Sequence, residues 1–310
     1  MAACEGNATT APSPSPTPTP VPVPAQPRFA YTGRVVSTQS GGPVPDALVA
    51  LDTLAPFQAD ATGSFTVEAA KTPLRAVISA PGYITRETSV SAGHPLTVDL
   101  IAIAAPFSSI FYGQLVRNML ESPAPDIVRT LPAAPSFYLQ TTGLSGGNVT
   151  RLIAAAREIV PAMTGGRFEV TTFETGSEAR PERPGWIVVE VVQEPQSTLC
   201  GHAFIGETSG HIWLNTVSTE TTFCADRSNG DTIARPLFQH EIGHALGFRH
   251  IDVPGSLMKS AGWLPSTVLT DSERYHATIA YRRQAGNRDP DIDAATVPPL
   301  SARSTVMVAD

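Results

Sequence analysis

The chain has few charges and few cysteines, and it contains no basic cluster and no long apolar run. Charged residues make up 16% of the 310 residues, and the formal net charge is -7. Because phosphate binding needs a concentrated Lys/Arg surface, this composition argues against nucleic acid as a partner. No apolar run approaches the roughly 18 residues of a membrane span. Hydrophobic residues reach 42%, so a packed core is expected, and the length predicts about two domains.

The first of the three cysteines lies close to the start of the chain. Cys4 follows two alanines, and small residues before such a cysteine resemble the end of a bacterial lipoprotein signal. This resemblance implies a lipid on Cys4, the only membrane association we expect, and an exported protein at the cell surface, in the periplasm or secreted. The alternative is an incidental cysteine in a tail.

The other two cysteines, Cys200 and Cys224, are left as a possible pair. In an exported protein they are candidates for a disulfide, which would contribute about 3 kcal/mol by the loop-entropy estimate. The alternative is two buried thiols, and the spacing does not decide between them.

Composition divides the chain into segments. Residues 1–27 end in a stretch with eight prolines between Pro12 and Pro27, which predicts an extended spacer. Residues 28–103 contain short runs of Val, Ile, Thr and aromatics between turn residues, and these predict an antiparallel β-sandwich. The expected strands are 29–36, 47–52, 64–68, 74–79, 85–90 and 96–100. Residues 104–135 are read as a connecting segment with one short helix at 112–120.

The sandwich segment resembles a known family in four places. These are Gly33–Val36, Gly42–Val49, Asp60–Phe65 and Ala80–Tyr83. Together they resemble the carboxypeptidase regulatory-like domain, which implies a small transthyretin-like sandwich and says little about activity.

The remaining residues, 136–310, alternate between strand and helix patterns and predict an α+β domain. Strands are expected at 136–140, 168–173 and 186–192, and helices at 148–159, 231–247 and 271–282. Segments 201–205 and 211–215 are expected to form an edge hairpin.

One stretch in this domain carries chemistry, the run from His240 to His250, which reads HEIGHALGFRH. On a helix His240 and His244 share one face, so both imidazoles can reach one ion. Gly247 can end the helix in a left-handed conformation, and the returning chain can bring His250 as a third ligand. Three neutral ligands leave a fourth position for water, as in catalytic zinc sites. Glu241 lies beside the ligands as a candidate base. Three satisfied structural histidines are the alternative reading.

This stretch resembles the extended motif of the metzincin zinc metalloproteases at every fixed position. The resemblance implies a mixed sheet with an active-site helix, one zinc ion on His240, His244 and His250, and Glu241 as general base. It also implies that Met258 forms a floor under the metal, since it lies in a Met-containing turn at matrixin-like spacing after His250. The chain shows no cysteine-switch segment, and Lys259–Trp263 lacks the tyrosine that some relatives have after this turn. The subfamily stays open.

We therefore expect a monomeric zinc endopeptidase that acts on protein or peptide substrates. Its substrate is expected to lie as an added strand along 201–205 or 211–215. The competing hypothesis is a surface-anchored adhesin or glycan-binding protein with a structural or latent metal site. Hydrolysis of a non-peptide amide is a second enzymatic alternative. His202 and His211 are read as packing or surface residues, with a second metal or substrate contact as the alternative.

Overall fold

The described part of the chain is an α+β protein with several sheets. The structure is a computed structural model and describes residues 28–52, 54–70, 73–205, 208–217, 224–260, 264, 266–294 and 307–309. Cys4 and the proline-rich segment expected at 1–27 lie outside these residues. Within them the chain forms four α-helices and three sheets.

Two of the sheets, formed by residues 29–100, share one hydrophobic core. The strand order of the first sheet is β4 (Ser64–Ala69), β1 (Phe29–Ser37) and β7 (Leu96–Leu100). The strand order of the second sheet is β3 (Phe57–Gln58), β2 (Leu48–Leu51), β5 (Leu74–Ser79) and β6 (Arg86–Val90). Alternating residues point inward, as the period of a strand requires, and Val35 and Val98 of the first sheet belong to the same buried cluster as Val49 and Ile78 of the second. We call this unit the sandwich lobe.

The third sheet has six strands and is mixed. Its order is β13 (Met307–Ala309), β11 (Gly201–Phe204), β12 (Gly210–Asn215), β10 (Trp186–Val192), β8 (Ser136–Gln140) and β9 (Phe173–Gly176). Strands β12, β10, β8 and β9 pair in parallel, whereas β11 pairs antiparallel with both β12 and β13.

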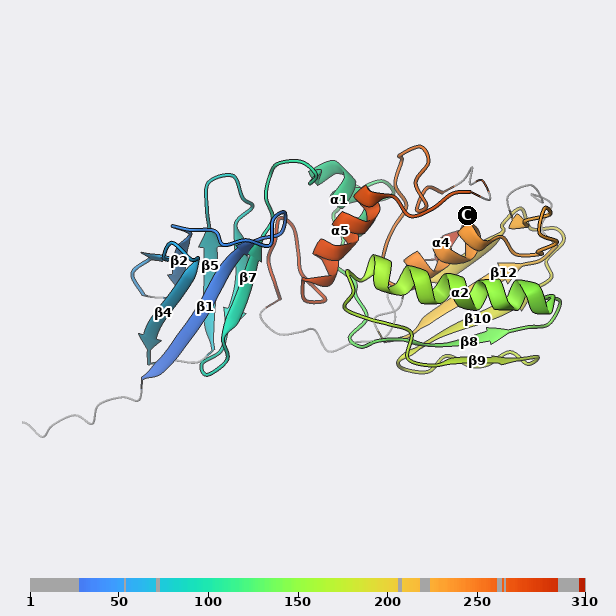
Figure 1. The fold of residues 1–310 in the computed structure, drawn as a ribbon, viewed down its shortest axis with the longest axis horizontal. Helices are drawn as coiled ribbons and strands as arrows, with labels where there is room; N and C mark the ends of the chain where they lie inside the picture. The colour runs from blue at the N-terminus through green and yellow to red at the C-terminus, as the bar shows by residue number, and fades with distance from the viewer. Residues whose placement is uncertain are drawn as a thin grey trace, which may run out of the picture.

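Helices cover one face of this sheet and fill the space beside it. Helix α2 (Gly146–Met163) and helix α4 (Arg235–Ala245) pack together, and their apolar residues share a core with Ile187 and Val189 of β10. Helix α1 (Ser109–Arg117) and helix α5 (Asp271–Tyr281) pack together on the side of this unit that faces the sandwich lobe (Figure 1). None of the described helices has the length and hydropathy of a membrane span. We call residues 101–294 with β13 the metal lobe, after the candidate ligands His240, His244 and His250 that it contains.

Most expected elements appear near their expected bounds, and four expectations were wrong in detail. The sandwich expected to be antiparallel is not wholly so, because β1 pairs in parallel with β7. The expected strand 168–173 is wrong except at its last residue, because Phe168 follows the end of α2 and packs edge-on against Tyr281 of α5. The helix expected from residue 231 begins at Arg235, after a turn closed by Asp226 and Asp231. The expected hairpin forms, but β12 lies inside the sheet and β11 is covered by β13, so neither is an open edge.

Buried ion pairs join the two lobes. Asp99 of β7 accepts from Arg86 at 2.5 Å and from Arg283 of the metal lobe at 2.9 Å. Arg86 also contacts Asp293, and Arg283 contacts Asp291 at 2.7 Å. Burial alone would raise the pKa of Asp99, but Arg283 and Arg86 outweigh it and hold this pKa below its usual value. The network ties the lobes together through charges that are removed from water.

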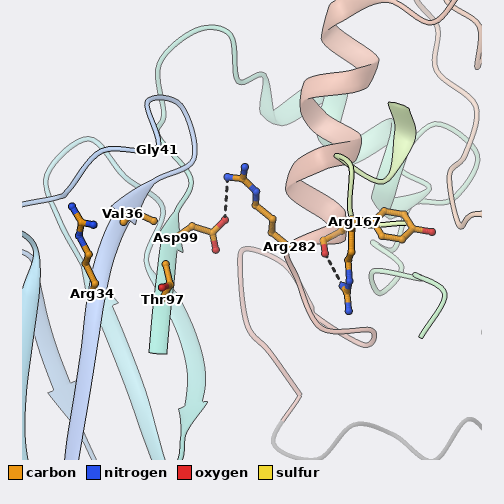
Figure 2. A pocket seen from close by; sticks show the side chains of 8 residues that line it. Arg34, Val36, Gly41, Thr97, Asp99, Arg167 and Arg282 are labelled. Atoms are coloured by element: carbon orange, nitrogen blue, oxygen red, sulfur yellow. Dashed lines mark hydrogen bonds and ion pairs between the residues drawn. The ribbon is translucent and has the colours of Figure 1, made fainter. Parts of the chain in front are cut away.

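A cleft of about 600 Å³ opens beside this network. Figure 2 shows Arg282 reaching across it toward Asp99, with Arg167 bonded to the carbonyl of Tyr281 on the far side. The junction is therefore only partly filled by protein atoms.

Candidate metal centre

Helix α4 presents two histidines from a fully buried position. The helix begins at Arg235 with Pro236 in its first turn, where the missing N–H of proline is no loss. His240 and His244 are both 0% exposed, and their Nε2 atoms lie 2.9 Å apart. Four-residue spacing on a helix therefore brings the two rings to one point, as the sequence predicted.

The chain after α4 turns back because of Gly247. This residue has φ +106, and a Cβ there would overlap the carbonyl oxygen of Arg129. Both conditions require glycine. The turn is closed by hydrogen bonds from Gly247 N to the His244 carbonyl at 2.8 Å and from Phe248 N to the Gly243 carbonyl at 3.0 Å. It returns His250, which is 3% exposed, to a ring-centroid distance of 4.8 Å from His244.

Each of the three rings has an acceptor at its outer nitrogen. The Nδ1 of His240 bonds to the Leu257 carbonyl at 2.7 Å, and that of His244 to the Phe248 carbonyl at 2.8 Å. A carbonyl oxygen only accepts, so in the neutral rings both Nδ1 atoms carry the proton and both Nε2 atoms keep a lone pair. The site is thus set for ligation through Nε2.

His250 differs from the other two because its acceptor is a carboxylate. Its Nδ1 lies 2.6 Å from Oε1 of Glu121, a residue of the connecting segment. A carboxylate at this position orients a ligating imidazole and makes it more basic. The sequence analysis did not identify Glu121, because no spacing in the sequence links residue 121 to residue 250.

The donor set fits a zinc ion. The candidate ligand atoms of His240, His244 and His250 all lie within 4.8 Å of one another. Three nitrogens at about 2.0–2.1 Å from zinc in tetrahedral geometry are about 3.3 Å apart, so small shifts suffice for binding. Within the described ranges these residues form the one such group of three His, Cys, Asp or Glu side chains.

Glu241 lies beside these ligands and against strand β11. Its side chain is 0% exposed. A Cβ on Gly201, the first residue of β11, would lie 2.6 Å from Oε1 of Glu241. The absence of a side chain at Gly201 thus makes room for the carboxylate, and this contact also escaped the sequence analysis. The carboxylate therefore lies in the protein interior, next to the main chain of β11 and on the same helix as His240 and His244.

Met258 packs beneath the helix that bears the ligands. It is 0% exposed, and its sulfur lies so close to Gly243 of α4 that a side chain at Gly243 would overlap it. Its main chain is also held, because Met258 N donates to Glu273 at 2.7 Å and the Met258 carbonyl accepts from Ile251 at 2.9 Å. Glu273 belongs to the capping box of α5, so that helix positions the turn.

The connecting segment contacts the ligand-bearing turn at several points. Arg249, 1% exposed, pairs with Asp126 at 2.7 Å, and its main-chain N donates to the Leu115 carbonyl at 2.8 Å. Burial lowers the pKa of Arg249, while Asp126 opposes that shift. Residues 109–131 are therefore part of the metal lobe and more than a spacer between domains.

The remaining predicted site residues lie elsewhere. Cys200 and Cys224 form a disulfide, which ties the residue before β11 to the approach to α4. His202 and His211 both stack on Trp213, and His211 lies 3.4 Å from Glu182 and 3.3 Å from Glu190. Neither histidine joins the metal group.

Comparisons with known proteins assign no family. No family model matches the chain, and no curated protein matches it. Among solved structures it is similar to a 3-chlorocatechol 1,2-dioxygenase from Rhodococcus opacus 1CP, at 15% identity and a TM-score of 0.20, over 25% of this chain and 61% of that one. It is also similar to a protein of unknown function, described as membrane-associated, from Bacteroides fragilis, at 18% identity and a TM-score of 0.20, over 46% of this chain and 53% of that one. The chain thus spans little more than half the length of these structures, and such scores carry no argument about fold or activity.

Proposed function

We propose that the protein is a zinc-dependent endopeptidase. One observation carries the proposal: three buried histidines converge on one point, and the buried carboxylate of Glu241 comes from helix α4, which also bears His240 and His244. A purely structural ion needs no adjacent carboxylate, whereas hydrolysis needs a base within reach of the attacking water.

The fold supports the resemblance to metzincins that the motif suggested. The metal lobe has a mixed sheet in which β11 pairs antiparallel with β12. In the sequence β11 is followed by β12 and then by α4, which bears His240 and His244. Met258 lies under α4, where a Met turn is expected. From the resemblance of its four sequence segments, we also propose a transthyretin-like, carboxypeptidase regulatory-like fold for the sandwich lobe. Its proposed role is to position the metal lobe through the buried ion pairs.

The proposed chemistry assigns a task to each group. A zinc ion on the three histidines would polarise the peptide carbonyl and bring the pKa of its water toward about 7. Glu241 accepts the proton of the attacking water and then delivers it to the leaving amine. Glu121 and the carbonyls of Leu257 and Phe248 hold the three rings in place.

The disulfide supports an exported protein. Such bonds persist in oxidising compartments, so Cys200–Cys224 agrees with the lipoprotein-like start of the chain. We propose a cell-surface, periplasmic or secreted enzyme.

A peptide library tests the function. The parent and Glu241→Gln proteins are each incubated with it, with and without a zinc chelator, and cleavage is read by mass spectrometry. We expect cleavage by the untreated parent alone, with a loss in the variant of at least about 10²–10⁴-fold, the usual contribution of a general base. Equal cleavage by both proteins would exclude this role for Glu241. Zinc bound by both with cleavage by neither would favour a latent or structural site.

A further inference from the structure

The outer edge of β11 is covered by a segment from far along the chain. Residues 307–309 pair antiparallel with it, with Met307 opposite Phe204, Val308 opposite Ala203 and Ala309 opposite His202. Strand β12 occupies the other edge of β11. The outer edge is therefore the side on which an added peptide strand can pair, and in this structure β13 takes it.

This edge leads to the proposed base. Gly201 is the first residue of β11, and its main chain lies against the carboxylate of Glu241. Because β13 runs antiparallel to β11, its chain proceeds toward Gly201 in the amino-to-carboxyl direction. Ala309 lies opposite His202, the residue that follows Gly201. A peptide in the same register would carry its next residues toward Glu241, so β13 lies where residues before a scissile bond would lie.

We propose that the outer edge of β11 binds extended peptide and that residues 307–309 compete for it within the same chain. This inference rests on the proposed peptidase function and adds its regulation. When residues 307–309 occupy the edge, substrate residues on the amino side of the scissile bond cannot pair there, whereas residues on its carboxyl side are not affected. If residues 307–309 hold the edge for about nine-tenths of the time, the apparent KM rises about tenfold and kcat is unchanged.

Val308→Pro tests the competition, with Val308→Ala as its matched control. Proline removes a main-chain N–H and restricts φ in the middle of a three-residue strand, whereas alanine keeps the backbone able to pair. A protein truncated after residue 306 serves as the second variant. Two peptides chosen from the library are compared: one extended on the amino side of the cleaved bond, and one extended only on its carboxyl side.

We expect Val308→Pro and the truncation to lower KM about tenfold for the first peptide and to leave the second unchanged, as the population argument requires. Val308→Ala should behave like the parent. If KM for the first peptide stays the same or rises in both variants, β13 merely protects a sheet edge and the proposal is wrong.

A binding measurement separates this proposal from the peptidase function. A fluorescent peptide spanning residues 303–309 is titrated into Glu241→Gln proteins with and without Val308→Pro, and its polarisation is followed. Tighter binding to the Val308→Pro protein supports the docking edge even if no protein cleaves any peptide. Equal or absent binding to the two overturns it, whatever the activity.

Discussion

The two lobes differ in where they bury charged and polar side chains. In the sandwich lobe the shared core is apolar, and its buried charged residues, Arg86 and Asp99, lie at the junction with the other lobe. In the metal lobe His240, Glu241 and Glu273 sit inside the protein at 0% exposure. Burying such groups costs free energy unless they are hydrogen-bonded or bind an ion. The difference agrees with our proposal that the metal lobe carries the chemistry.

The metal lobe offsets this cost with specific partners. His240 and His244 donate to carbonyls, and Glu273 accepts from Met258 and caps α5. Each partner also fixes the geometry of the site. Changes in the metal lobe should therefore alter metal binding, whereas changes in the sandwich core should alter stability alone.

The largest expected effect is that of Gly247→Ala. Alanine disfavours the positive φ, and its methyl group would overlap the Arg129 carbonyl, so the turn that returns His250 must move. We expect at least about 4 kcal/mol of lost stability, in the range reserved for severe backbone and packing conflicts. Urea unfolding and zinc titration measure both effects, and a variant with parental values in both would refute this account of the turn.

Ile78→Ala in the sandwich lobe gives the contrasting case. Ile78 is 0% exposed within the apolar core, and truncating such a side chain costs about 2–5 kcal/mol. Urea unfolding should show this loss, while the zinc affinity of the folded protein stays parental. A weakened affinity would mean that the two lobes are coupled more tightly than their separate cores suggest.

Asp99→Asn weakens the connection between the lobes in a pH-dependent way. The pKa of Asp99 is lower in the folded protein than in the unfolded chain, so its contribution is present above about pH 4 and is lost as pH falls through the folded pKa. Near pH 7 we expect about 3 kcal/mol of destabilisation, as for a broken buried pair. Urea titrations from pH 7 to pH 2 should show the parent and variant converging in acid; a constant difference contradicts this role.

Glu121→Ala has the smallest expected effect on stability, because the Glu121 side chain is 37% exposed. Zinc affinity should fall about 10–100-fold, the usual result of removing the partner of a ligating histidine. Glu121→Gln keeps an acceptor for Nδ1 of His250 and should recover part of the loss. Competition with a chelating dye measures both, and unchanged affinity in the alanine variant would show that Glu121 does not position the ligand.

Local patterns in the sequence predicted the convergence of three histidines and most strands, whereas tertiary contacts decided the other features. Residues 240–250 follow one another, so helix periodicity and a glycine were enough to bring three histidines together. Glu121 and Gly201 reach the same site from distant segments, and no periodicity connects them. Phe168 also has a strand-like pattern, but its packing against Tyr281 decides its conformation.

The central claim is that one zinc ion is bound by His240, His244 and His250 with an open fourth position. Zinc K-edge X-ray absorption on the purified, dialysed protein tests it directly. We predict one zinc per chain with three nitrogen neighbours and one oxygen at about 2.0–2.1 Å. A protein that retains no zinc, or a zinc ion with sulfur ligands or four protein ligands, would contradict the claim.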